Sequence, residues 1–237
     1  MSKKALVAVG HSLLVIIYHV LKNRASYQEL GGDYFDRDCE RQFITDYTDQ
    51  AHKPEVRSLV LPMTLNGSGI RDISRVLSMS TNTLLKVLRS TAHQVNESVV
   101  PKRIADLELD EFWSVVGKKR HQRWTWSAFD RHRKRTTASL NGRRTNKNCQ
   151  RLLQKLTESR VRRFHTDRWE SYLKLLPEKK HLIGKEGRRN IERHNLNFRT
   201  HIKRLQRRRI CFSKSDEMHD AVIKLYIQHS NLGQHHI

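Results

Sequence analysis

Acidic residues are scarce in this sequence. Its 237 residues include 46 Lys and Arg but only 24 Asp and Glu, for a formal net charge of +22. The imbalance is concentrated in one part of the chain, because residues 101–237 carry 34 basic and 14 acidic residues. Such an excess of positive charge favours a polyanionic partner, and the commonest polyanion is nucleic acid. A solvated basic surface, as in a ribosomal-type protein, is the alternative interpretation.

Cysteine is equally sparse. Cys39, Cys149 and Cys211 are far apart and odd in number, so the pattern excludes a disulfide framework, and a reducing cytoplasm is the expected compartment. A structural zinc site needs about four ligands, and the stretch DCERQFITDY supplies only Cys39. We therefore expect no zinc.

Long apolar runs are also missing. The best candidate, residues 5–21, is interrupted by His11, Ser12, Tyr18 and His19, which makes it short and polar for a membrane span. We interpret this run as a buried or interfacial helix, and we expect no membrane partner.

Residues 52–95 have the pattern of a small helical module. An apolar first helix, a turn at residues 66–69 and a second helix precede a third helix, for which Ser80 is a good N-cap. Leu84 and Leu88 place the apolar side of this third helix toward a core. Helix, tight turn, helix is the arrangement that lays a second helix in the major groove of DNA.

The exposed side of the third helix is where we expect DNA contacts. The candidate residues are Thr81, Asn82, Lys86 and Arg89, with Arg71 of the second helix near the DNA backbone. The alternative is a plain helical packing unit, because such helix pairs also occur in proteins that never bind DNA.

Residues 101–237 alternate between strand and helix patterns. Three segments rich in aromatic and β-branched residues, LELDEFWSVVG, RWTWSAFD and RTTASL, predict consecutive antiparallel strands. A crossover helix, a fourth strand VRRFHTD, a short helix, a fifth strand HLIGK and a long final helix over residues 189–208 follow. This order predicts an α/β fold, a mixed sheet flanked by helices in the ribonuclease H-like arrangement, preceded by the small all-α module.

Three carboxylates fall on these elements. Asp110 lies on the first strand, Asp167 ends the fourth strand, and Glu192 opens the final helix, with residues 168–191 between the last two. Oxygen ligands suit Mg²⁺ or Mn²⁺, and two such ions about 3.5–4 Å apart can serve both sides of a phosphodiester exchange. We therefore expect these three residues to bind metal and to catalyse the cutting and joining of DNA.

Asp110 has several acidic neighbours. Asp106, Glu108 and Glu111 are close in sequence, and any one of them could instead be a surface carboxylate. Period two puts Glu108 on the face of Asp110 and turns Glu111 to the other face, so Glu111 is the weaker candidate.

Asp167 and Glu192 could also have purely structural roles. Asp167 could cap the helix that begins near Trp169, and Glu192 could pair with Arg188 or Arg189. What supports a catalytic role for the carboxylates together is that they fall on the elements that the chemistry requires.

Further basic residues follow Glu192. Asn195 and Arg199 share its helical face, so Arg199 is expected to touch substrate phosphate. His194 lies roughly 200° round the helix from Glu192, which favours a core position. A basic cluster is expected to hold the DNA backbone by a sequence-independent contact: Lys203, Arg204, Arg207, Arg208 and Arg209.

Residues 39–231 resemble the transposases of the insertion sequence 1 family, in which a zinc ribbon and a helix-turn-helix precede a catalytic domain of the DDE type. The resemblance rests on the motifs CERQF, NGSGIRDISRVLSMSTNTLLKVL, LDEFWSVVGKKRHQRWTWSAFDRHRK, HTDRWESY, IERHNLNFRTHIKRLQRRRICFSKS and MHDAVIKLYI. It implies the catalytic roles for Asp110, Asp167 and Glu192.

Residues 3–36 resemble instead the carboxyl end of insertion sequence 110 family transposases, which implies a chimeric reading frame. The expected domains are a foreign helical segment over residues 1–38, a zinc-ribbon remnant with the helix-turn-helix over residues 39–100, and the ribonuclease H-like DDE domain over residues 101–237.

The resemblance implies a DNA transposase that cleaves the ends of an insertion sequence and transfers the 3′ ends to target DNA, with Mg²⁺ or Mn²⁺. Its partners would be double-stranded DNA, at element ends and target, and further copies of itself in a homodimer or larger assembly. It would act in the bacterial or archaeal cytoplasm, at the nucleoid. Two alternatives are a catalytically inactive DNA-binding repressor and a metal-dependent nuclease that cleaves without joining.

Overall fold

The computed structural model describes residues 17–18, 21–22, 53–96, 99–206 and 211–233. The chain divides into two compact units, Met1–Asp46 and Tyr47–Ile237. Apart from residues 17–18 and 21–22, which are helical, the predictions for the amino-terminal segment and for Cys39 lie outside the described residues. Every helix and strand named below belongs to the second unit.

Three helices come first: α3 (Pro54–Leu65), α4 (Ile70–Leu77) and α5 (Thr81–Gln94). α5 begins as expected, because the Ser80 Oγ accepts a hydrogen bond from the Thr83 nitrogen at 3.1 Å. At the start of α4 the Asp72 carboxylate accepts a hydrogen bond from the Gly69 nitrogen at 3.1 Å. These two caps fix the residues at which α4 and α5 begin.

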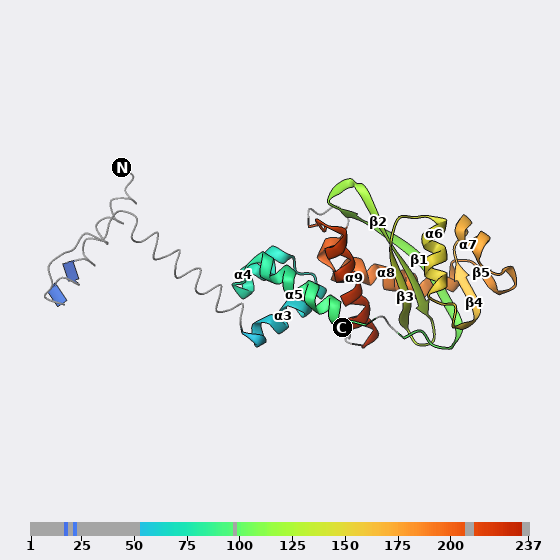
Figure 1. Cartoon of the computed structure of the whole chain (residues 1–237), viewed down its shortest axis with the longest axis horizontal. Coiled ribbons are helices and arrows are strands. Elements are labelled where there is room, and N and C mark those ends of the chain that lie inside the picture. Colours follow the sequence, from blue (N-terminus) through green and yellow to red (C-terminus); the bar gives the residue numbers. More distant parts are fainter. Residues whose placement is uncertain (1–16, 19–20, 23–52, 97–98, 207–210, 234–237) are drawn as a thin grey trace. The chain divides into compact units, whose positions relative to one another are not determined.

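A five-stranded sheet follows, with the strand order β3-β2-β1-β4-β5 (Figure 1). The strands are β1 (Arg103–Val116), β2 (Lys118–Asp130), β3 (Arg135–Gly142), β4 (Arg160–Thr166) and β5 (His181–Ile183). β2 is antiparallel to both β1 and β3, whereas β4 is parallel to both β1 and β5. The predicted fold class, a mixed sheet with flanking helices, is confirmed.

The hairpin of β1 and β2 is longer than the sequence pattern predicts. β1 begins at Arg103, and β2 starts at Lys118, directly after Gly117. Gly117 has a φ of 69°, a backbone conformation that glycine adopts far more readily than other residues. The strands therefore pair almost to this tight turn, with Val115 opposite Gln122.

The remaining helices are α6 (Asn146–Gln154), α7 (Glu170–Leu175), α8 (Arg189–His201) and α9 (Asp216–Asn231), with short 3-10 turns η1 (Glu178–Lys180), η2 (Glu186–Arg188) and η3 (Lys203–Leu205). The prediction of one helix over residues 189–208 is wrong. α8 ends at His201, because Ile202 takes extended backbone angles (φ −106°, ψ 104°) that turn its buried side chain into the core. Among the described residues, no helix has the length and apolarity needed to cross a membrane.

The two faces of the sheet have separate cores. Leu107 and Leu109 of β1 pack with residues of α6 and α7 on one face. On the other face Phe112 packs against Phe198 of α8, with ring centroids 5.1 Å apart. Because side chains alternate along a strand, the even-numbered residues from Asp106 to Phe112 lie on the face of α8. Asp110 is one of them.

The core beneath α8 extends to the helix-turn-helix. Buried residues of α3, α4 and α5 form one cluster with α9 and with the end of α8. The backbone also joins these parts, since the Gly67 nitrogen donates to the His201 carbonyl at 2.6 Å. Gly67 lies in the turn after α3 and has a φ of 81°. The helix-turn-helix and the sheet therefore share one hydrophobic core.

Candidate active site

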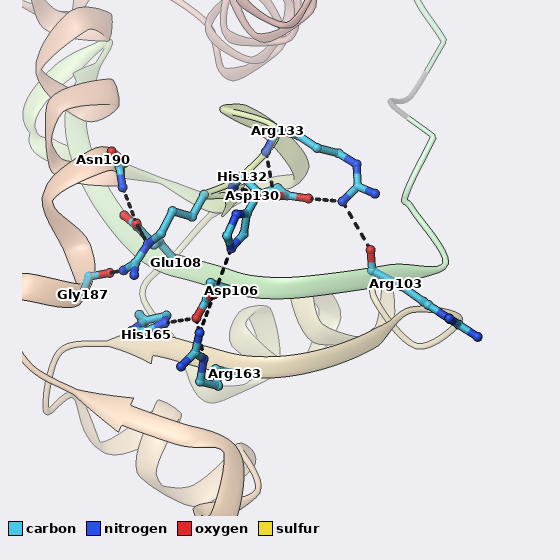
Figure 2. Close-up of polar contacts among 11 residues, drawn as sticks. Arg103, Asp106, Glu108, Asp130, His132, Arg133, Arg163, His165, Gly187 and Asn190 are labelled. Atoms are coloured by element: carbon cyan, nitrogen blue, oxygen red, sulfur yellow. Dashed lines mark hydrogen bonds and ion pairs between the residues drawn. The ribbon is translucent and has the colours of Figure 1, made fainter.

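Glu108 is the most deeply buried carboxylate on the face of β1 that meets α8. It accepts hydrogen bonds from Arg131 Nε and from Asn190 Nδ2, both at 2.8 Å, the latter drawn in Figure 2. Its second oxygen accepts from the Ile191 backbone nitrogen at 2.8 Å. The first N–H groups of a helix have no partner within the helix, so Glu108 satisfies one of them and fixes the start of α8 against β1.

Asp106 is the centre of a second polar network on the same face (Figure 2). Its oxygens lie 2.7 Å from His165 Nε2, 3.0 Å from His132 Nε2 and 2.7 Å from Arg163 Nε. Burial on its own would raise the pKa of Asp106, but the hydrogen bonds from Arg163, His165 and His132 hold that pKa well below its usual value. Gly187 approaches closely, because a Cβ there would lie 2.5 Å from His165 Nδ1.

Asp110 lies between residues of α8 and the turn before it. Asn195 Nδ2 donates to Asp110 Oδ2 at 2.8 Å, and Arg188 Nη1 lies 3.4 Å from Asp110 Oδ1. The side chain of Asp110 is 16% exposed. Burial, and then repulsion by the neighbouring Glu111 carboxylate, raises the pKa of Asp110 to about 7, against the opposing charge of Arg188. The site thus stabilises this carboxylate weakly when no further cation is present.

Glu192 lies on the first turn of α8 and is half exposed. Its Oε1 is 3.3 Å from Arg188 Nη2, an ion pair between positions i and i+4. The pairing with Arg188 that the sequence leaves open is therefore present. The same guanidinium contacts Asp110, so Arg188 joins the two carboxylates.

Asp167 follows β4 immediately. Its Oδ1 accepts a hydrogen bond from the Trp169 nitrogen at 3.0 Å, but Trp169 is itself the N-cap residue of α7. The bond therefore closes the turn before α7, and the helix cap weighed from the sequence is not formed by the Asp167 side chain. The parallel register of β1 and β4 places Glu108 opposite His165. Continued by two residues, this register brings Asp110 level with Asp167 on neighbouring strands.

Glu111 belongs to the other face of the sheet, as period two predicts. The Tyr172 hydroxyl donates to it at 2.8 Å, and Arg144 pairs with it at 2.7 Å. Burial raises the pKa of Glu111. The Arg144 guanidinium lies 4.9 Å from the ring centroid of Trp124 and 4.6 Å from that of Trp169. These contacts give Glu111 a structural environment distinct from that of Asp110.

The structure brings Asp110 and Glu192 to one guanidinium, whereas the hydrogen bond to Asp167 comes from its own loop. Within the described ranges, no group of three or more His, Cys, Asp or Glu side chains is arranged to hold a metal ion. The three predicted carboxylates thus occupy neighbouring elements without forming one such cluster.

The donor atoms beside Asp110 nonetheless suit a hard cation. Asn195 donates to Asp110 with Nδ2, which leaves its buried Oδ1 without a hydrogen-bond partner in the part of the chain that the structure describes. An unpaired buried acceptor is costly, and carboxylate and amide oxygens are ligands for Mg²⁺ and Mn²⁺. By chemistry, Asp110, Glu192 and Asn195 fit a divalent cation where the guanidinium of Arg188 lies.

The helix-turn-helix presents most of its predicted DNA contacts to solvent. The exposed ones are Arg71, Thr81, Asn82 and Lys86. Arg89 differs, because it is half-buried and its Nε lies 3.4 Å from Glu217 Oε1 of α9. The carboxyl half of α5 therefore faces α9, and its amino-terminal half is free to meet a ligand.

The two described residues of the basic cluster after α8, Lys203 and Arg204, are engaged within the protein. Lys203 Nζ donates to Asp72 Oδ2 of α4 at 2.8 Å, and Arg204 Nη1 lies 3.4 Å from Ser213 Oγ. Burial lowers the pKa of Arg204 to about 10. Both residues lie in η3 and not on the predicted continuous helix.

The remaining predicted residues are Arg199, Arg207, Arg208, Arg209 and His194. The Arg199 guanidinium lies 5.7 Å from the ring centroid of Phe112. Arg207, Arg208 and Arg209 lie outside the described residues. His194 is buried, with Nε2 3.0 Å from Thr136 Oγ1, so its expected core position is confirmed.

Sequence reasoning gave no role to His165 and weighed Asp106 only as a surface carboxylate. The signal that joins them is the parallel pairing of β1 with β4, which places Asp106 opposite Arg163 and Glu108 opposite His165. A single sequence does not show which strands pair in this way.

Comparison with known proteins gives two family matches. Residues 103–232 match the IS1 transposase family, and residues 47–92 match the family described as the InsA C-terminal domain. The resemblance of residues 3–36 to insertion sequence 110 transposases has no support among these matches.

Curated relatives give the same result. The chain is 45% identical over 121 residues to the insertion element iso-IS1n protein InsB of Shigella dysenteriae, covering 51% of this chain and 92% of that protein. It is 45% identical over 120 residues to the insertion element IS1 protein InsB of Shigella flexneri, with the same coverage. The insertion element IS1 2 protein InsB of Escherichia coli K12 is 45% identical over 120 residues, covering 72% of that protein.

Proposed function

The chain belongs to the family of IS1 transposases, enzymes of the DDE type, and from this membership we propose that it cleaves the ends of an insertion sequence and joins them to target DNA. Asp110, Asp167 and Glu192 are the proposed catalytic residues. Mg²⁺ or Mn²⁺ is the proposed cofactor, in keeping with the divalent metal ions that DDE enzymes use.

One observation carries the site proposal. Asp110 of β1 and Glu192 of α8 both contact a single cationic group, the guanidinium of Arg188. Asp167 directly follows β4, the strand beside β1, and is level with Asp110 in the extended register. The three proposed residues thus come from adjacent elements of the fold.

The chain's own residues have distinct roles in this proposal. Asp110, with Glu192 and the Asn195 oxygen, would hold a divalent ion, and Asp167 would approach from β4. A bound Mg²⁺ would polarise the scissile phosphate and activate the attacking water or 3′ hydroxyl. Glu108 keeps the start of α8 in place and so maintains the separation of Asp110 and Glu192.

DNA binding is the proposed role of two surfaces. The first surface would contact the bases or the backbone at the element end, and its residues are exposed: Arg71, Thr81, Asn82 and Lys86. Arg199, Arg207 and Arg208 are proposed contacts to the phosphate backbone. Cutting two ends and joining both to one target requires at least two active sites, so we expect a homodimer or larger assembly on DNA.

The test is Mg²⁺-dependent cleavage and joining of labelled element-end DNA. Asp167→Asn should abolish both products while salt-sensitive DNA binding persists. Glu170→Gln is a matched control, because Glu170 is an exposed carboxylate three residues away that pairs only loosely with Lys174, at 3.3 Å. This control should retain activity.

Each other outcome has a distinct meaning. Cleavage without covalent donor–target junctions would make the protein a nuclease. DNA binding without cleavage in either protein would favour a repressor derived from a transposase. Cleavage that survives Asp167→Asn would refute the proposed site.

A further inference from the structure

Building on the proposed function, we infer that Arg188 is an internal cation that occupies the metal position between Asp110 and Glu192, and that a divalent ion must displace it to bind. The geometry of Arg188 motivates this inference. Its Nη1 is 3.4 Å from Asp110 Oδ1 and its Nη2 is 3.3 Å from Glu192 Oε1. Only 14% of its side chain is exposed, so the guanidinium that contacts both carboxylates is largely shielded from solvent.

Arg188 lies at the junction between η2 and α8, close to both carboxylates that it contacts. Arg188 ends η2 and is the N-cap residue of α8, one turn before Glu192. Asp110 is on the central strand β1. One side chain thus neutralises carboxylates from two elements that would otherwise repel each other across the junction of α8 and the sheet.

The contacts of Arg188 with its two carboxylates are longer than those that Arg123 and Arg131 make with theirs. Charge-assisted N–H···O bonds are usually about 2.7–2.9 Å long. Arg123 lies 2.6–2.7 Å from Asp216 and Asp220, and Arg131 lies 2.8 Å from Glu108. Arg188, at 3.3–3.4 Å, does not reach that distance. Such long contacts favour replacement of the guanidinium by a competing cation.

Unsatisfied polar atoms next to Arg188 point the same way. Its Nε is buried without a hydrogen-bond partner within the described parts of the chain, and so is Asn195 Oδ1. Unpaired buried groups cost free energy, so this arrangement depends on the charge of Arg188 and on its long hydrogen bond to Asp110. A small ion coordinated by the oxygens of Asp110, Glu192 and Asn195 would satisfy the amide oxygen that Arg188 leaves unpaired.

Displacement has two consequences. The apparent affinity for metal is lower than the intrinsic one, because part of the binding free energy is used to move Arg188 out of the position. The released guanidinium remains beside the bound ion, where it can donate to a DNA phosphate by a bidentate contact. Arg188 would then act as a positioning residue for the substrate in the metal-bound protein.

The experiment measures Mn²⁺ binding to the full chain without DNA, by the loss of the electron paramagnetic resonance signal of free Mn²⁺. Arg188→Gln should bind Mn²⁺ about tenfold more tightly than the unaltered protein. Arg189→Gln is the control, because it removes the same charge from the next residue, which is exposed. Its affinity should stay the same. Arg188→Lys keeps the charge but cannot bridge both carboxylates, so it should show an intermediate affinity. This variant keeps the inference testable if Arg188→Gln does not fold.

Two outcomes would overturn the inference: an unchanged or weaker Mn²⁺ affinity in folded Arg188→Gln, or an equal gain in Arg189→Gln. Asp110→Asn separates this failure from that of the proposed function. If Asp110→Asn weakens Mn²⁺ binding while Arg188→Gln does not strengthen it, only the role of Arg188 is wrong. If Asp110→Asn binds Mn²⁺ as tightly as the unaltered protein, the proposed metal position is wrong as well.

Discussion

Glu108 and Ile191, 83 residues apart in the chain, are joined by a hydrogen bond of 2.8 Å from the Ile191 backbone nitrogen to the Glu108 carboxylate. Ile191 immediately precedes Glu192, and Glu108 lies two residues before Asp110. This bond therefore joins the strand and the helix that carry two of the proposed catalytic groups.

Two substitutions of Glu108 should separate its effect on the position of α8 from its effect on the stability of the protein. Glu108→Ala leaves Arg131 without its buried partner and the start of α8 unsatisfied, so we expect a loss of about 3 kcal/mol in the free energy of unfolding. Glu108→Gln keeps an acceptor for Ile191 and should lose only about 1 kcal/mol. Urea denaturation measures both values.

DNA cleavage is the second measurement on these variants. It should be partly restored in Glu108→Gln relative to Glu108→Ala at a temperature where both are folded, because the Gln oxygen can still fix α8. Equal cleavage by the two folded variants would contradict a positioning role.

Asn195 should contribute to metal binding. Asn195→Ala removes the unpaired Oδ1 and the donor that orients Asp110, so Mn²⁺ affinity should fall by about tenfold. The exposed neighbour Leu196 supplies the control, since Leu196→Ala should leave the affinity unchanged. A similar loss in both variants would point to a general effect on α8.

The two basic residues of α5 should differ in their effect on DNA binding. Lys86 is exposed, so Lys86→Ala should weaken binding and reduce the slope of log affinity against log salt by about one. Arg89→Ala should have a smaller effect, because Arg89 is paired with Glu217. Conversely, Glu217→Gln should strengthen DNA binding by releasing Arg89. An unchanged affinity in Glu217→Gln would argue that this pair has no influence on DNA contact.

His219 should make the fold sensitive to acid. It is fully buried, with Nε2 3.0 Å from Ser114 Oγ, and burial together with the charges of Arg123 and Arg204 lowers its pKa to about 3. Below the unfolded value of 6.5 the unfolded chain binds a proton that the folded protein does not. The stability that neutral His219 confers is thus complete above pH 6.5 and is lost progressively as the pH falls toward 3.

This linkage predicts a loss of about 2 kcal/mol in the free energy of unfolding between pH 7 and pH 5. His219→Gln stays neutral and should show a smaller loss over the same range, as measured by denaturant titration at each pH. The exposed His93 provides the comparison, because His93→Gln should leave the pH dependence of the parent protein unchanged.

Local patterns predicted the elements that carry the candidate site. Period-two alternation places Asp110 on one face of β1 and Glu111 on the other, and both are found there. The pair of Glu192 with Arg188 was also open to sequence reasoning, because it joins neighbouring turns of one helical segment. The contact of Arg188 with Asp110 spans 78 residues and depends on how α8 meets the sheet, which local patterns do not encode.

Helix α9 was absent from the sequence-based prediction for a related reason. Its residues Val222, Ile223, Leu225, Tyr226 and Ile227 are all buried, so apolar side chains surround much of the helix and weaken the 3.6-residue period. The packing of α5 on α9 was therefore also missed. For the same reason, the different surroundings of Arg89 and Lys86 could not be predicted.

The shared core of α3, α4, α5, α8 and α9 has a consequence for where the DNA is cut. A rotation of α4 and α5 against the sheet would expose Phe198, Ile202 and Leu205 to water. The proposed DNA contacts of α5 and the proposed catalytic residue Asp110 are therefore held at a fixed distance within the protein. We expect every productive cut to fall at one fixed number of base pairs from the recognised sequence.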